Sequence, residues 1–158
     1  MLYAILKTLH LLSLMVWIGG MVFAHFFLRP AVGGLEPAVR VRLMYAVLGR
    51  FFSAVLLAAA LVLVSGGWMM GRMARQLAES GVRFNMPLEW IVMASLGLLM
   101  MLIFGYIRFV LYRLLGRAVQ AQNWPAGGAA LGQIRFWVLV NLSLALLIVL
   151  VTMLGLAS

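Results

Sequence analysis

Four long apolar runs dominate the sequence and limit the folds open to it. They extend roughly over residues 9–28, 51–71, 90–107 and 136–156. A helix rises about 1.5 Å per residue, so about 20 residues match a hydrocarbon core roughly 30 Å thick. Inside lipid, the backbone must satisfy its own hydrogen bonds, as a helix of this length does. We therefore expect four membrane-spanning helices.

The composition agrees with an integral membrane protein that has one domain. Hydrophobic residues make up 66% of the 158 residues and charged residues only 9%, whereas soluble domains carry about 25% charged residues. The expected fold class is all-α: an integral membrane four-helix bundle over residues 1–158, with short loops and cytoplasmic helix extensions. We expect its helices at about 4–28, 38–78, 88–121 and 130–157, with a break at 123–128.

The basic residues predict how the bundle is oriented. Cytoplasmic connections carry an excess of lysine and arginine, and the first and third connections hold more of these residues than the other side does. The first and third connections and the adjoining helix ends hold Arg29, Arg40, Arg42, Arg50, Arg108, Arg113, Arg117 and Arg135. The other side holds Lys7, Arg72, Arg75 and Arg83. We therefore expect a multi-pass protein of a bacterial inner membrane with both termini in the periplasm. This placement explains the net charge of +9 without a nucleic-acid partner.

His10 is the main candidate for a functional side chain because it lies within the first apolar run. Ionisable groups at membrane depth usually face a bundle interior or a cavity. Trp17 follows seven residues later, on nearly the same helix face. Successive helices alternate direction, so His10 should lie level with residues 65–70 and 90–96. His25 lies about 22 Å away along the same helix axis, so the two histidines cannot bind the same metal ion or haem.

Methionines provide soft donor atoms at the same depth. The chain has 12 methionines, of which Met69, Met70 and Met93 are expected near the level of His10. Thioether and imidazole groups together suit a soft ion such as Cu(I), and the shortage of carboxylates argues against hard cations. We predict a metal site of His10, Met69 and Met93 near the outer face. Simple filling of apolar space is the alternative role for each methionine.

Other polar side chains have more ordinary interpretations. Ser65, Ser95, Ser143 and Asn141 could form hydrogen bonds between helices or line a path. We expect the interhelical bonds, with Asn141 as the exception among the four. Arg108 and Arg135 could hold an anionic group such as a lipid headgroup, or extend to the interface.

Several classes of chemistry are excluded by what the sequence lacks. It has no cysteine, which rules out disulfides, thiolate metal sites and cysteine catalysis. It contains no P-loop, dinucleotide fingerprint, HExxH or nucleophile elbow, and only three acidic residues. Hydrolytic and nucleotide chemistry are therefore not expected, and we assign no catalytic residue.

The motif Lys7-x-x-His10-x6-Trp17-x-Gly19-Gly20 resembles the first helix of small bacterial membrane proteins of the copper resistance D (CopD) family. The resemblance continues through Arg42-Leu43-Met44 and through the size and spacing of the four helices. It implies copper homeostasis, often described as copper uptake across the inner membrane. Candidate partners are then the lipid bilayer, a periplasmic copper-binding protein and further copies of the chain.

The same first-helix pattern is similar to the HemJ family, four-helix haem-binding membrane proteins that oxidise protoporphyrinogen. This likeness implies haem b as the cofactor, with His10 as an axial ligand and Trp17 beside it. That family carries a lysine on its third helix, where this sequence has only Glu89 and Arg108 at the ends. The departure argues against porphyrinogen oxidation but leaves haem binding open.

Three functions therefore follow from the sequence. The favoured one is a protein of copper homeostasis that binds or passes Cu(I) through a His/Met site at His10, a role that fits a binding or transport protein better than an enzyme. The second is a haem b membrane redox protein. The third is a structural subunit without a ligand, in which His10 only forms a hydrogen bond to a neighbouring serine or asparagine.

Overall fold

A computed structural model describes residues 1–79 and 88–155 of the chain, and these residues form helices and no strand. Four helical segments account for nearly all of them. They are α1 (Leu2–Val22) with η1 (Phe23–Leu28) and α2 (Arg29–Ala31); α3 (Pro37–Glu79); α4 (Leu88–Tyr106) with η2 (Ile107–Leu111) and α5 (Tyr112–Gln120); and α6 (Trp124–Gly155). Each segment is long and apolar enough to cross a membrane. The structure thus confirms the all-α prediction of a multi-pass membrane protein.

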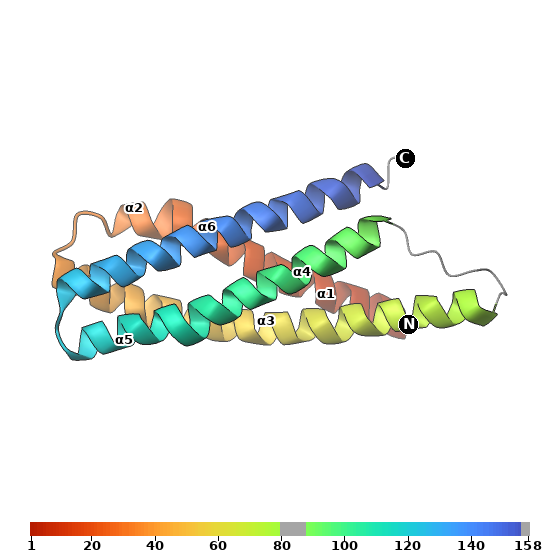
Figure 1. Ribbon diagram of the computed structural model, residues 1–158, viewed down its shortest axis with the longest axis horizontal. Coiled ribbons are helices and arrows are strands. Elements are labelled where there is room, and N and C mark those ends of the chain that lie inside the picture. The colour runs from red at the N-terminus through yellow and green to blue at the C-terminus, as the bar shows by residue number, and fades with distance from the viewer. Residues whose placement is uncertain (80–87, 156–158) are drawn as a thin grey trace.

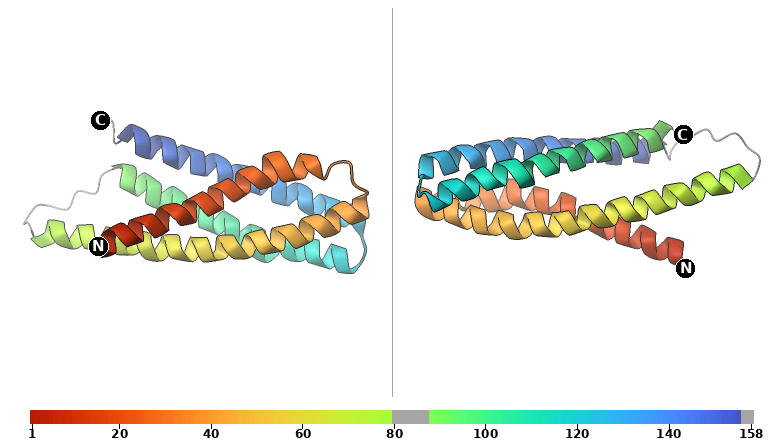
Figure 2. Two further views of the ribbon diagram at one scale, coloured as in Figure 1. Left: turned by 180° about the vertical axis from the view of Figure 1, so that it is seen from behind. Right: turned by 60° about the horizontal axis from the view of Figure 1, so that its bottom comes forward.

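The four segments run along one axis, with the connections at 32–36 and 121–123 at the end opposite to both termini (Figure 1). Helix α1 packs mainly against α3, and α4 mainly against α6. Toward the termini these two pairs diverge, as the views from other sides show (Figure 2). The bundle is therefore tightest in its middle and near the two described connections.

Aromatic side chains form the centre of the packed core. Phe52 of α3 is 1% exposed, and its ring lies edge-on to Phe104 at 6.0 Å and to Tyr112 at 5.6 Å. Tyr112 also donates a hydrogen bond of 3.1 Å to the carbonyl of Tyr45, which joins the third segment to α3. Van der Waals packing of this kind holds helices together in lipid, where the hydrophobic drive between helices is absent.

The fourth helix begins at Trp124, earlier than the expected start near residue 130. Asn123 caps it, because its Oδ1 accepts a hydrogen bond of 3.0 Å from the backbone N–H of Ala126. Pro125 is tolerated in the first turn, where its missing N–H would have no partner. A Cβ on Gly127 would lie 2.7 Å from Cγ1 of Val41. The glycines read as helix breakers therefore lie inside a helix, where Gly127 allows α6 to approach α3 closely.

The first segment continues to Ala31, past the expected end near residue 28. Pro30 lies within its last turns and cannot donate a backbone hydrogen bond. The turns before it widen into the π-helix η1, in which the N–H of Arg29 bonds to the carbonyl of Ala24. This wider turn carries His25 and places it at the end of the bundle that holds the described connections.

Candidate functional site

His10 and Ser65 meet where α1 packs against α3. The His10 Nδ1 atom lies 2.9 Å from the Ser65 Oγ atom. Ser65 is only 2% exposed, and His10 is partly buried. The structure confirms that His10 and Ser65 lie at the same depth along the bundle, and it confirms the expected interhelical bond of Ser65.

The hydrogen bonds of Ser65 favour one tautomer of His10. The Ser65 hydroxyl donates to the carbonyl of Leu61, one turn earlier on α3. A hydroxyl has one proton to donate, so the same Oγ accepts from the imidazole, and Nδ1 carries the hydrogen. In a neutral ring the lone pair is then on Nε2. Ser65 is the side-chain partner of the ring, and the ring also interacts with the backbone of Val62, less than one turn before Ser65 on α3.

Gly66 lets the imidazole ring lie close to α3. A Cβ at this position would be 3.2 Å from His10 Cε1 and 3.7 Å from Nδ1. Small residues allow such close approach between membrane helices. A larger residue at 66 would press against the ring and shift its hydrogen bond to Ser65.

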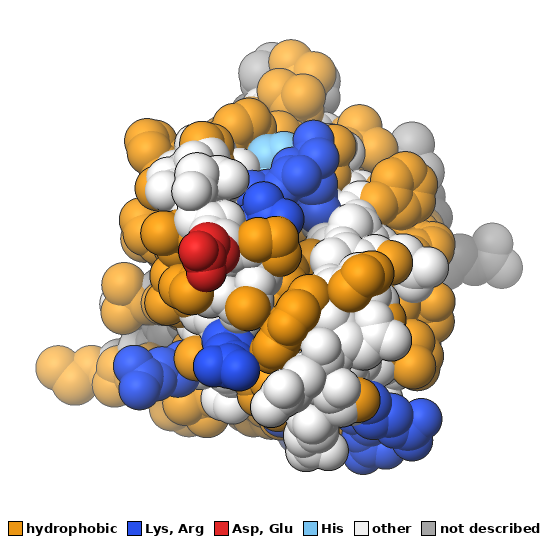
Figure 3. Space-filling view, turned by 90° about the vertical axis from the view of Figure 1, so that its left-hand side faces the viewer, with side chains coloured by type: hydrophobic (Ala, Val, Ile, Leu, Met, Phe, Trp, Pro, Cys, Tyr) orange, Lys and Arg blue, Asp and Glu red, His pale blue; other side chains and the backbone are white. Residues whose placement is uncertain are grey.

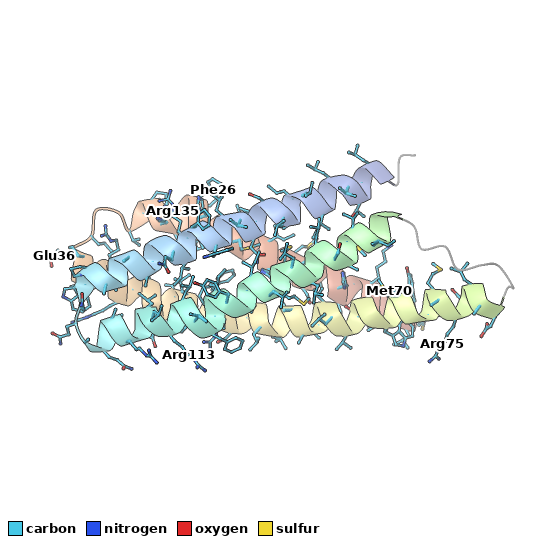
Figure 4. The ribbon with its side chains drawn as sticks, in the orientation of Figure 1. Phe26, Glu36, Met70, Arg75, Arg113 and Arg135 are labelled. Carbon is cyan, nitrogen blue, oxygen red and sulfur yellow. The ribbon has the colours of Figure 1, made fainter. Side chains whose placement is uncertain are left out.

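Met69 lies one turn beyond Ser65 on α3, about 6 Å further along the axis toward the termini. It is partly buried and lines a recess of about 300 Å³ together with Tyr3, Arg72, Met73 and Gln76. Figure 4 labels the adjacent Met70 on this stretch of α3. The thioether of Met69 is thus carried on the same pair of helices as His10, but one turn nearer the end of the bundle.

Met93 is carried by α4, which packs mainly against α6 rather than against α1. At this depth the two helix pairs diverge (Figures 1 and 2). A shared ligand set of His10, Met69 and Met93 therefore requires the pairs to close toward each other. This three-residue set stays a prediction.

Trp17 is a core side chain, 3% exposed, with its ring edge-on to Phe104 at 5.7 Å. The surrounding protein gives it a clear packing role. Its predicted place beside a haem is not tested by these contacts, and it stays a prediction.

The remaining polar residues of the apolar runs behave differently from Ser65. Ser95 and Ser143 are exposed, and their hydroxyls donate to the carbonyls of Ile91 and Leu139 on their own helices. Their predicted interhelical bonds are wrong, because both side chains point away from the bundle and bond locally. Asn141 is 1% exposed, and its Oδ1 has no hydrogen-bond partner among the residues that the structure describes.

The fold and the site define a class of protein: a multi-pass helical membrane protein with an imidazole hydrogen-bonded between two spanning helices. A family model, Copper resistance protein D (CopD), matches residues 45–154. The chain belongs to the CopD family, as the sequence resemblance predicted. No curated protein and no solved structure matches the chain.

The family match covers α3 to α6 almost completely, including Ser65, Met69 and Met93. It begins after His10 and Trp17, the residues of the first-helix motif from which the resemblance was inferred. Family membership therefore rests on a different part of the chain from the proposed imidazole ligand.

Proposed function

We propose that this protein acts in copper homeostasis by binding or passing Cu(I) at the Nε2 atom of His10. The observation that carries the proposal is the 2.9 Å contact between His10 Nδ1 and Ser65 Oγ, which holds the ring in the orientation in which Nε2 would act as the ligand atom. Histidines that bind metals commonly donate the other ring N–H to such a partner, which fixes the tautomer and the ring orientation. Membership in the CopD family agrees with copper as the cargo.

The donor atoms near His10 favour a soft ion. Within the described residues, no group of three or more His, Cys, Asp or Glu side chains could hold a metal ion. Hard cations prefer carboxylate and carbonyl oxygens, whereas thioethers and imidazole suit Cu(I). Met69 has a flexible side chain that can turn along α3 toward the ring. Met93 would join the ligand set when the α4–α6 pair closes on the α1–α3 pair.

The position of His10 fits exchange with the outer side of the membrane. The excess of arginine at the described connections predicts that this end faces the cytoplasm. His10 then lies toward the periplasmic end of a bacterial inner membrane, where a periplasmic copper-binding protein could deliver or accept the ion.

Copper retention by purified protein tests the proposal. The protein is loaded with Cu(I) under reducing conditions in detergent, and bound copper is measured for wild type, His10→Ala and His25→Ala. His25→Ala is the matched control, because it removes the other imidazole about 22 Å away along the same segment. We expect stoichiometric copper in wild type and in His25→Ala, and loss of copper in His10→Ala.

Three results would contradict this assignment. The first is wild-type protein without copper, and the second is equal retention in His10→Ala. The third is a His10-dependent Soret band in copper-free protein that was produced with ample haem. This band would support the haem b function instead. Full copper resistance of cells with His10→Leu would favour a structural subunit.

A further inference from the structure

A second pocket lies at the end of the bundle opposite to the His10 site. It has a volume of about 440 Å³ and lies between the first segment, the amino-terminal part of α3 and α6. Its polar lining consists of His25, Arg29, Arg40 and Arg135. Figure 3 views this end and shows blue basic side chains gathered beside a pale-blue histidine. Arg135 lies where α6 passes the end of the first segment (Figure 4).

The arginines of this pocket are not neutralised by acidic side chains. No carboxylate lines the pocket, and none forms an ion pair with these arginines among the described residues. Arg29 lies within electrostatic range of two like charges, Arg135 and Arg40, and His25 lies near Arg29 and Arg135. Like charges that line one pocket raise the free energy of the folded protein. An anion in the pocket would remove that cost.

Within the described part of the chain, the N–H donors of these arginines have few hydrogen-bond partners. Arg40 makes one long hydrogen bond of 3.5 Å, from Nη1 to the carbonyl of Gly33. A guanidinium has five N–H donors in a planar fork that matches the oxygens of a phosphate. Arg40 comes from α3 and Arg135 from α6, so their donors can approach one anion from different sides.

The rest of the pocket is apolar and has free space. Its lining includes Val32, Met44, Leu48 and Val138. Gly132 also lines it, and a Cβ added there would meet no atom within 4 Å. An apolar wall beside an arginine cluster suits an anion that carries an organic group, such as the phosphate of a lipid.

We propose that this pocket binds a phosphate-type anion through Arg29, Arg40 and Arg135. Basic pockets between membrane helices on the cytoplasmic side bind anionic headgroups, and this end is the predicted cytoplasmic end. The phosphate can come from an anionic phospholipid or from free inorganic phosphate, and the experiment separates these sources. The site is distinct from His10 and does not depend on copper binding.

Two variants test the two features of the pocket separately. Arg29→Gln with Arg135→Gln removes charge from the lining, whereas Gly132→Leu keeps every arginine and fills the space. The matched control is Arg113→Gln with Arg117→Gln, which removes the same charge from exposed positions of α5 outside the pocket. Each protein is placed in nanodiscs of phosphatidylcholine with or without phosphatidylglycerol, and retained lipid is counted by native mass spectrometry. A parallel series titrates detergent-purified protein with inorganic phosphate.

We expect wild type and the α5 control to retain phosphatidylglycerol in preference to phosphatidylcholine, or to bind inorganic phosphate. Each arginine near a membrane surface changes anion affinity by about fivefold, so the double arginine variant should bind at least tenfold more weakly. Gly132→Leu should lose binding although its charge is unchanged. Binding in the lipid series alone identifies a headgroup, and binding in the phosphate series identifies the free ion. Equal binding by wild type and both pocket variants, or no anion preference in wild type, would overturn the proposal and leave these arginines as residues that only reach the interface.

Discussion

Replacing Ser65 with alanine should weaken Cu(I) binding at His10 without removing any direct ligand. The substitution deletes the acceptor of a 2.9 Å hydrogen bond from Nδ1. Ser65 is only 2% exposed, so water has little access to replace the lost oxygen. The ring can then move its proton to Nε2 or rotate away, and either change competes with metal binding. Removal of such outer partners typically costs 10–100-fold in metal affinity, which is about 1.4–2.7 kcal/mol.

The measurement is a competition between the detergent-purified protein and a Cu(I) chelator of known affinity under reducing conditions. Ser143→Ala is the matched control, because the Ser143 hydroxyl is exposed and bonds to the Leu139 carbonyl of its own helix at 3.0 Å. We expect the Ser65→Ala affinity to fall by at least tenfold and the Ser143→Ala affinity to stay within twofold of wild type. A Ser65→Ala affinity equal to that of wild type would refute the role assigned to the hydrogen bond. An equal loss in both variants would refute it as well.

Two further predictions concern packing and orientation. Gly127→Ala should destabilise the bundle by about 1–3 kcal/mol through overpacking against Val41, whereas Gly128→Ala, whose Cβ would meet no atom within 4 Å, should be neutral or stabilising. Unfolding in a denaturing detergent measures the stability of both variants. Equal stabilities would contradict the close approach of α6 to α3. The chain has no cysteine, so Leu2→Cys and Gly34→Cys report on topology with no background. A membrane-impermeant maleimide added to spheroplasts should label Leu2→Cys and spare Gly34→Cys, and the reverse pattern would invert the proposed orientation.

Hydrophobic patterning in the sequence was sufficient to predict the four helices and the level of His10. Lipid leaves few choices for the backbone, and helices of fixed rise that alternate direction place residues at calculable depths. This reasoning matched His10 with Ser65, and the hydrogen bond between them confirms it. The direction in which a side chain faces is harder to predict, because the apolar runs have apolar residues on every side. Ser95 and Ser143 were assigned to the interior for that reason, and the structure places both on the outside.

Features that depend on contacts between distant segments were not predictable in the same way. The glycines after Asn123 resemble a helix break, and their role in packing against Val41 becomes visible only when α3 lies beside α6. The arginine-lined pocket has the same origin, since Arg29, Arg40 and Arg135 are separated in sequence and are brought together by three segments. His25 lines the same pocket, and nothing in the sequence indicates that space is left between these side chains.

X-ray absorption spectroscopy of the Cu(I)-loaded protein tests the central claim most directly, because it reports the atoms bound to copper. We expect one imidazole nitrogen and thioether sulfur in the copper shell of wild-type protein, and loss of the imidazole signal in His10→Ala. A copper shell without imidazole in wild type, or an unchanged imidazole signal in His10→Ala, would contradict this claim.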